Sequence, residues 1–150
     1  MNDIGFRLIQ LAAKGYCCSQ ILAILALEAQ GRENPDLVRA MAGLCMGAGT
    51  GGACGVFTGA ACVLALYGAK GADAEKAADK LPLMLAELGE WFEQTACASF
   101  GGTSCTDIIG EGSGRPDPNR CGRLLVDTWG RLQEILVENG FDPDNPETRS

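Results

Sequence analysis

The chain has 150 residues, of which 47% are hydrophobic, and it carries a net charge of −7 at pH 7. A chain of this length buries roughly 70% of its unfolded surface, so we expect a single domain over residues 1–150 with a substantial core. Its acidic balance, with a pI of about 4.5, lacks the basic surface that nucleic acids and anionic membranes attract, so neither is expected as a partner.

The first half of the chain predicts four helices. Residues 4–14 form a short helix that Gly15 ends, and residues 17–30 form a second. Apolar side chains cover nearly the whole circumference of the second helix, so it should be central and buried. A third helix is expected at about 36–44 and a fourth at about 56–67.

An uncharged, glycine-rich stretch, residues 41–61, lies between the third and fourth predicted helices. It contains seven glycines and two cysteines, and its loop delivers Cys54 to the start of an apolar helix. Residues 40–69 carry no charge, but their more apolar half, 56–67, is too short for a membrane span, which needs roughly 20 residues. A buried core segment is therefore expected.

The second half of the chain is also helical in pattern. We expect a long helical region at about 73–99, one turn at 105–109, a surface loop at 110–119, a last helix at about 121–139 and a frayed tail at 141–150. Pro82 should kink the long region or mark a restart near Leu81. Since no stretch alternates at period two, the predicted fold is all-α, a compact bundle of about five to six helices.

Cysteine is the residue type in this composition that is best suited to redox or metal chemistry. The chain has eight cysteines and no histidine, which removes histidine acid–base catalysis and mixed Cys/His zinc sites. Charges interrupt the apolar run at the N-terminus, so no signal peptide is expected, and a cytoplasmic, reducing location follows. There, cysteines serve as metal ligands or redox groups rather than as structural disulfides.

Four cysteines share one local context: each follows a turn signal and precedes a helical stretch. They are Cys18, Cys54, Cys105 and Cys121. The unpaired N–H groups at a helix start can donate to a thiolate, and the helix dipole favours its charge. We therefore predict that four helix starts converge to hold four thiolates around one redox centre. Gly51, Gly52 and Gly55 would let the backbone approach a bulky cofactor there.

These motifs resemble a known family. The residues GYCCSQ around Cys18, GGACGVFTGA around Cys54, GGTSC ending at Cys105 and the later Cys121 are similar to the C_GCAxxG_C_C family, over residues 4–137. Its members are described as redox-active proteins, mostly of anaerobic bacteria and archaea. A related module occurs in split-Soret cytochromes, where it is associated with an iron–sulfur centre beside haems. The chain departs from the pattern at Val56, in place of the usual alanine, and at Cys17.

Three functions remain open at this point. The first is electron transfer or redox sensing through a [2Fe–2S] or [4Fe–4S] cluster on Cys18, Cys54, Cys105 and Cys121, with an unidentified redox partner protein. The second is thiol–disulfide chemistry with the same cysteines and no cofactor, and the third is a structural four-cysteine zinc site. An electron-transfer or sensing role is favoured over a stand-alone enzyme, no catalytic residue is assigned, and a homodimer is one possible assembly.

The other cysteines are expected to be less specialised. Cys45, Cys62 and Cys97 sit among apolar residues on predicted helices, so they are interpreted as core filler. Cys17 either adds a ligand or fills the turn at Tyr16.

Overall fold

The structure is a computed structural model that describes residues 3–110 and 118–145. Over these ranges the chain forms seven α-helices and no strand, which confirms the all-α prediction. The α-helices are α1 (Asp3–Ala13), α2 (Cys18–Ala29), α3 (Pro35–Met41), α4 (Gly55–Gly68), α5 (Leu81–Phe100), α6 (Cys105–Ile109) and α7 (Arg123–Glu138). Three shorter turns complete it: η1 (Ala42–Leu44), η2 (Gly47–Gly51) and η3 (Pro118–Gly122).

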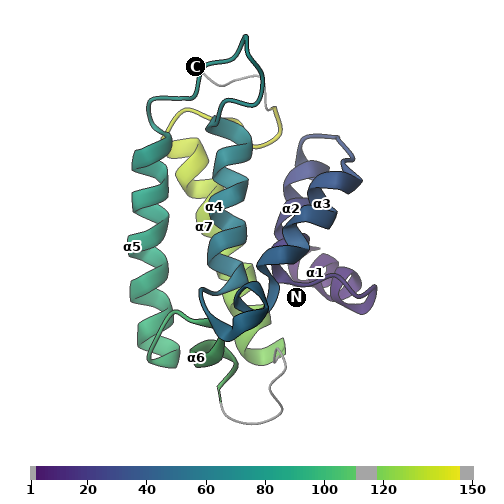
Figure 1. Ribbon diagram of the computed structural model, residues 1–150, viewed down its shortest axis with the longest axis vertical. Helices are drawn as coiled ribbons and strands as arrows, with labels where there is room; N and C mark the ends of the chain where they lie inside the picture. The colour runs from purple at the N-terminus through teal and green to yellow at the C-terminus, as the bar shows by residue number, and fades with distance from the viewer. Residues whose placement is uncertain (1–2, 111–117, 146–150) are drawn as a thin grey trace.

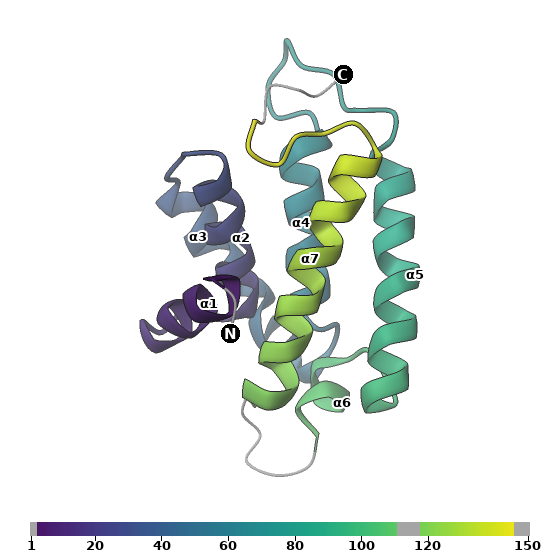
Figure 2. The same ribbon diagram turned by 180° about the vertical axis from the view of Figure 1, so that it is seen from behind.

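Helices α4, α5 and α7 run side by side along the long axis of the molecule, with α5 opposite in direction to the other two (Figure 1). Helix α2 packs against α4, and α1 and α3 flank α2 on the side away from α5. The short helix α6 and the glycine-rich loop lie at the end of the bundle where α4 and α7 begin (Figure 2). Several helix starts therefore gather at one end of the fold.

The core is mainly aliphatic, with Tyr67 and Phe92 as its largest fully buried side chains, and α2 and α4 share its most extensive helix–helix contact. The side chains that are fully shielded from solvent include Leu22, Leu64, Met84, Leu88, Leu132 and Ile135. Helices α2 and α4 approach closely because Gly59 faces Ser19: a Cβ on Gly59 would lie 2.9 Å from the Ser19 Cα. No helix within the described residues is long and apolar enough to cross a membrane.

The predicted helix over 73–99 is wrong in its first part. Residues 73–80 are not helical, with turns only at 73–74 and 79–80, and α5 begins at Leu81. Pro82 lies in the first turn of α5, where its missing N–H costs no intrahelical hydrogen bond. A helix that continued from residue 73 would have placed Pro82 in its interior, so the restart near Leu81 is the alternative that the structure bears out.

The chain after α7 is packed rather than frayed as far as it is described. Phe141 is buried, and the Tyr67 hydroxyl donates a hydrogen bond to the Pro143 carbonyl at 2.6 Å. These contacts correct the prediction of a frayed tail for residues 141–145. The rest of that tail, 146–150, and residues 111–117 of the predicted surface loop lie outside the described residues.

Candidate functional site

The structure places each of the four predicted cysteines at or just before a helix start. Cys18 and Cys105 are the first residues of α2 and α6, and Cys54 immediately precedes α4. Cys121 lies in η3, two residues before α7 begins. Cys54 and Cys105 are buried, and Cys18 and Cys121 are half-buried.

Backbone pairing brings Cys54 and Cys105 together. The N–H of Cys54 donates to the Thr103 carbonyl at 3.3 Å, and the N–H of Cys105 donates to the Gly52 carbonyl at 2.6 Å. These two bonds flank an isolated antiparallel bridge between Ala53 and Ser104. The glycine-rich loop and the segment before α6 are thereby held side by side, although they are far apart in sequence.

Gly55 provides the space for Cys18. A Cβ on Gly55 would lie 2.9 Å from the Cys18 Sγ and 2.9 Å from the Leu44 carbonyl oxygen. Real Cβ atoms essentially never come that close to another heavy atom, so only glycine fits the backbone at this point. The first turn of α4 can therefore approach the Cys18 thiol directly, and Cys54 is one residue away.

Arg120 holds the segment that carries Cys121. Its Nε donates to the Ile108 carbonyl at 2.6 Å and its Nη2 to the Asp107 carbonyl at 3.2 Å, so the guanidinium covers the C-terminal end of α6. It also lies over the Phe100 ring, 4.7 Å from the ring centroid. Sequence reasoning missed this residue, although a basic residue directly before Cys121 was the available signal.

The four thiols interact electrostatically, each with the other three. Burial raises the pKa of Cys18 to about 12, and the neighbouring charges of Cys54, Cys121 and Cys105 add to the shift, against a hydrogen bond from the Ser19 backbone. Burial also raises the pKa of Cys54 and of Cys105, and the charge of Cys121 contributes to both. The four positions that the sequence singled out are therefore close enough for their ionisation to be coupled.

The start of α4 supplies the hydrogen bonds expected at a helix terminus. The backbone N–H groups of Val56 and Phe57 donate to the Cys54 sulfur and lower its pKa, although burial outweighs them and the net shift is upward. These groups are among the unpaired donors of the first helical turn. A negatively charged sulfur at Cys54 would thus find two donors already in place.

Four thiols are the donor type that both zinc ions and iron–sulfur clusters bind. Within residues 3–110 and 118–145, no three His, Cys, Asp or Glu side chains are grouped as one metal ion would require.

Positions along the glycine-rich loop differ in backbone conformation and in the room that a side chain would have. Met46 and Ala48 have φ of 57° and 56°, a left-handed conformation in which non-glycine residues are uncommon. Gly51 has φ of 76°, and a Cβ there would collide with the Thr106 side chain, whose Oγ1 donates to the Gly51 carbonyl at 2.9 Å. Gly52 leaves more room than Gly55, since the atom nearest to an added Cβ is 3.4 Å away.

Three cysteines interpreted as core filler are not part of the core. Cys45 forms a disulfide with Cys17, which sequence reasoning did not anticipate. Cys62 and Cys97 are exposed. On α5 the buried positions recur every four residues, through Met84, Leu88, Phe92 and Ala96, and position 97 falls outside that stripe.

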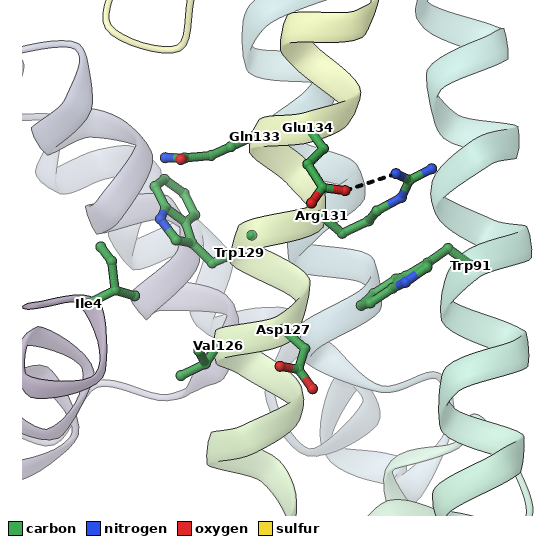
Figure 3. A pocket seen from close by; sticks show the side chains of 9 residues that line it. Ile4, Trp91, Val126, Asp127, Trp129, Arg131, Gln133 and Glu134 are labelled. Carbon is green, nitrogen blue, oxygen red and sulfur yellow. Dashed lines mark hydrogen bonds and ion pairs between the residues drawn. The ribbon is translucent and has the colours of Figure 1, made fainter. Parts of the chain in front are cut away.

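A surface groove of about 510 Å³ lies along α7, away from this chemistry. In Figure 3, Trp91 of α5 and Ile4 of α1 flank it, and an Arg131–Glu134 ion pair of 3.0 Å spans one turn of α7 within it. None of its nine lining residues is a cysteine. The coupled thiols, rather than this groove, are the candidate functional site.

Comparison with known proteins gives one match. A model of the family described as "Putative redox-active protein (C_GCAxxG_C_C)" matches residues 16–135. No curated protein and no solved structure matches the chain.

Proposed function

The chain belongs to the C_GCAxxG_C_C family, and from this membership and its coupled thiols we propose that it holds an iron–sulfur cluster for electron transfer or redox sensing. Cys18, Cys54, Cys105 and Cys121 would be the ligands. When bound, such a cluster would supply a centre that gains and loses single electrons. The residues of the chain bind it, shield it from water and donate hydrogen bonds to its sulfur ligands.

The observation that carries the proposal is the gathering of the cysteines: backbone hydrogen bonds pair the segments of Cys54 and Cys105, and Gly55, next to Cys54, lies against the Cys18 sulfur. Burial raises the pKa of Cys18 to about 12, and the charges that Cys54, Cys121 and Cys105 carry when ionised add to the shift. Iron would neutralise the charges that make four neighbouring thiolates unfavourable. The arrangement is unfavourable for free thiolates and well suited to a shared cation centre.

The raised pKa values weaken the cofactor-free alternative for these four residues. Thiol–disulfide exchange requires a thiolate as the attacking group, and reactive cysteines accordingly have lowered pKa values. Burial raises the pKa of Cys18, Cys54 and Cys105 instead. A structural zinc site on the same four sulfurs is the less favoured metal because a domain with this much core hardly needs a metal to fold.

Gly51, Gly52 and Gly55 would shape the wall of the centre, with Gly55 the most restrictive of the three because it faces the Cys18 sulfur. Two N–H donors of α4 already point at Cys54 and would remain available to its sulfur in the loaded protein. Hydrogen bonds to ligand sulfur are one of the factors that set a cluster's reduction potential.

Protein purified or reconstituted without oxygen provides the test, by its visible spectrum together with iron and acid-labile sulfide analysis. We expect a brown protein that contains both iron and sulfide. A colourless protein with one zinc per chain would establish the structural zinc site instead. A colourless protein that takes up neither metal after reconstitution would overturn the proposal.

A further inference from the structure

A disulfide lies beside the four-thiol group but shares no residue with it. It joins Cys17, immediately before α2, to Cys45, immediately after η1, with the two Cα atoms 6.2 Å apart. That separation is within the ordinary range for disulfides. Both residues are half-buried, so part of this pair faces solvent.

A buried hydroxyl offers Cys45 a hydrogen-bond partner in the reduced state. Ser19 is fully buried, and its Oγ lies 2.7 Å from the Met41 carbonyl oxygen and 3.0 Å from the Cys45 Sγ. A carbonyl can only accept, so the single hydroxyl proton points to Met41 and leaves lone pairs facing Cys45. A thiol at Cys45 has a hydrogen to donate to these lone pairs, whereas a disulfide sulfur has none.

Other bonds hold the two cysteines near each other whether or not the sulfurs are joined. The N–H of Cys17 donates to the Gln20 Oε1 at 3.2 Å, and the Gln20 Nε2 donates to the Val38 carbonyl at 3.2 Å. Together with the Ser19–Met41 bond, these contacts fasten the start of α2 to α3. Reduction would therefore leave both thiols positioned to pair again.

From this geometry we infer a second redox site: Cys17 and Cys45 form a reversible disulfide–dithiol couple that exchanges two electrons with an external dithiol. A thiolate of the dithiol attacks one sulfur of the pair, the Cys17–Cys45 bond breaks, and the released cysteine takes a proton. The second thiol of the partner then displaces the remaining cysteine. One dithiol is oxidised to its disulfide, and two cysteine thiols are formed.

The inference does not depend on the proposed cluster. Its reacting atoms are those of Cys17 and Cys45, and the exchange balances without iron. The two sites are nevertheless neighbours. Cys18 and Leu44 both face Gly55, and each is next in sequence to one cysteine of the disulfide. Metal-free protein can therefore test the couple while leaving the cluster proposal untouched.

The experiment equilibrates metal-free, full-length protein without oxygen in mixtures of reduced and oxidised dithiothreitol. Free thiols are then alkylated and located by peptide mass spectrometry. We expect Cys17 and Cys45 to become alkylated together, as one two-electron transition, in folded protein. Reduction only after unfolding would show a structural disulfide, and alkylation of both residues at every ratio would show that no couple exists; either result overturns the inference.

Variants sharpen the assignment. Cys45→Ser should leave Cys17 alkylated at every ratio, while Cys62→Ser, in an exposed cysteine outside the pair, should leave the transition unchanged. Ser19→Ala removes the acceptor for the Cys45 thiol, and the loss of its bond to Met41 affects both redox states alike. The disulfide should therefore be favoured, and the ratio of reduced to oxidised dithiothreitol at half reduction should rise by roughly threefold to tenfold. An unchanged midpoint in folded Ser19→Ala would contradict the role given to Ser19.

Discussion

Cys54 and Cys105, 51 positions apart in the sequence, are joined through their backbones by two hydrogen bonds on either side of the Ala53–Ser104 bridge. Each of the two residues then leads directly into a helix, α4 or α6. A pair of backbone bonds restrains the spacing of the two thiols more tightly than side-chain packing alone would. Half of the proposed ligand set is thus placed before any cofactor binds.

Replacing a proposed ligand should weaken iron binding, whereas replacing a cysteine outside the ligand set should not. Cys54→Ala or Cys105→Ala removes one thiolate from the centre. Loss of a residue that only supports a metal ligand already lowers metal affinity by about tenfold or more, so loss of a ligand should lower iron affinity by more than about tenfold. Iron and sulfide analysis after reconstitution measures it. Cys97→Ala, at an exposed position on α5, is the matched control and should bind iron as the unaltered chain does. Equal losses in all three variants would show that the ligands are misassigned.

Helix type and the cysteine-bearing helix starts could be predicted from the sequence because both depend on local signals. The apolar pattern of α2 and the glycines before Cys54 act within a few residues of the structures they determine. The predicted helix over residues 73–80 failed because helical composition alone does not make a helix, whereas the restart near Leu81, which Pro82 signalled, is where α5 begins.

Long-range contacts could not be predicted in the same way. The Cys17–Cys45 disulfide depends on how α2 meets η1, and the role of Arg120 depends on how η3 meets α6. Nor could the sequence rank the loop glycines: Gly55 is restricted by the sulfur of Cys18, which lies 37 positions away in the chain. These are properties of tertiary packing, and a single sequence carries no direct record of them.

Gly55 should tolerate no side chain. In Gly55→Ala the added Cβ would meet the Cys18 sulfur and the Leu44 carbonyl at 2.9 Å, so Cys18 or η1 must move. We expect a loss of about 1–3 kcal/mol in the free energy of unfolding, the usual cost of overpacking, measured by denaturant titration of metal-free protein. Reconstituted protein should also show an altered visible spectrum.

Gly43→Ala provides the control for this substitution. Gly43 lies in the same glycine-rich stretch, and an added Cβ would meet no atom within 4 Å. Its unfolding free energy and its spectrum should both match those of the unaltered chain. A Gly55→Ala protein as stable as Gly43→Ala would mean that the close approach to Cys18 is unimportant.

Arg120 should position Cys121 through its bonds to α6. Arg120→Ala removes the donors to the Ile108 and Asp107 carbonyls and the contact with Phe100, so we expect stability to fall by about 1–3 kcal/mol. The Cys121 thiol should also react several-fold faster with iodoacetamide, as measured by peptide mass spectrometry. Arg120→Lys should restore little, because an ammonium group cannot reproduce the planar fork of donors. The exposed Arg123 serves as the control in Arg123→Ala.

The buried thiols should make the metal-free, reduced protein sensitive to alkaline pH. The pKa of Cys18 is about 12 in the folded protein against 9.0 for an unperturbed cysteine, so between these values the unfolded chain loses a proton that the folded chain retains. The stability that this thiol contributes is therefore fully present below about pH 9 and is lost as the pH rises towards about 12. We expect Tm to fall progressively from about pH 9 upwards, measured by circular dichroism.

Cys18→Ala isolates that contribution from the titration of other groups. The variant lacks the thiol that resists ionisation, so its Tm should fall less steeply above about pH 9 than that of the unaltered chain. Cys97→Ala should keep the full slope, because that thiol is exposed and lies outside the coupled group. In protein loaded with the cluster, Tm should also fall less steeply with pH, because metal-bound cysteines are already deprotonated. Parallel curves for Cys18→Ala and Cys97→Ala would show that burial of Cys18 does not govern the alkaline response.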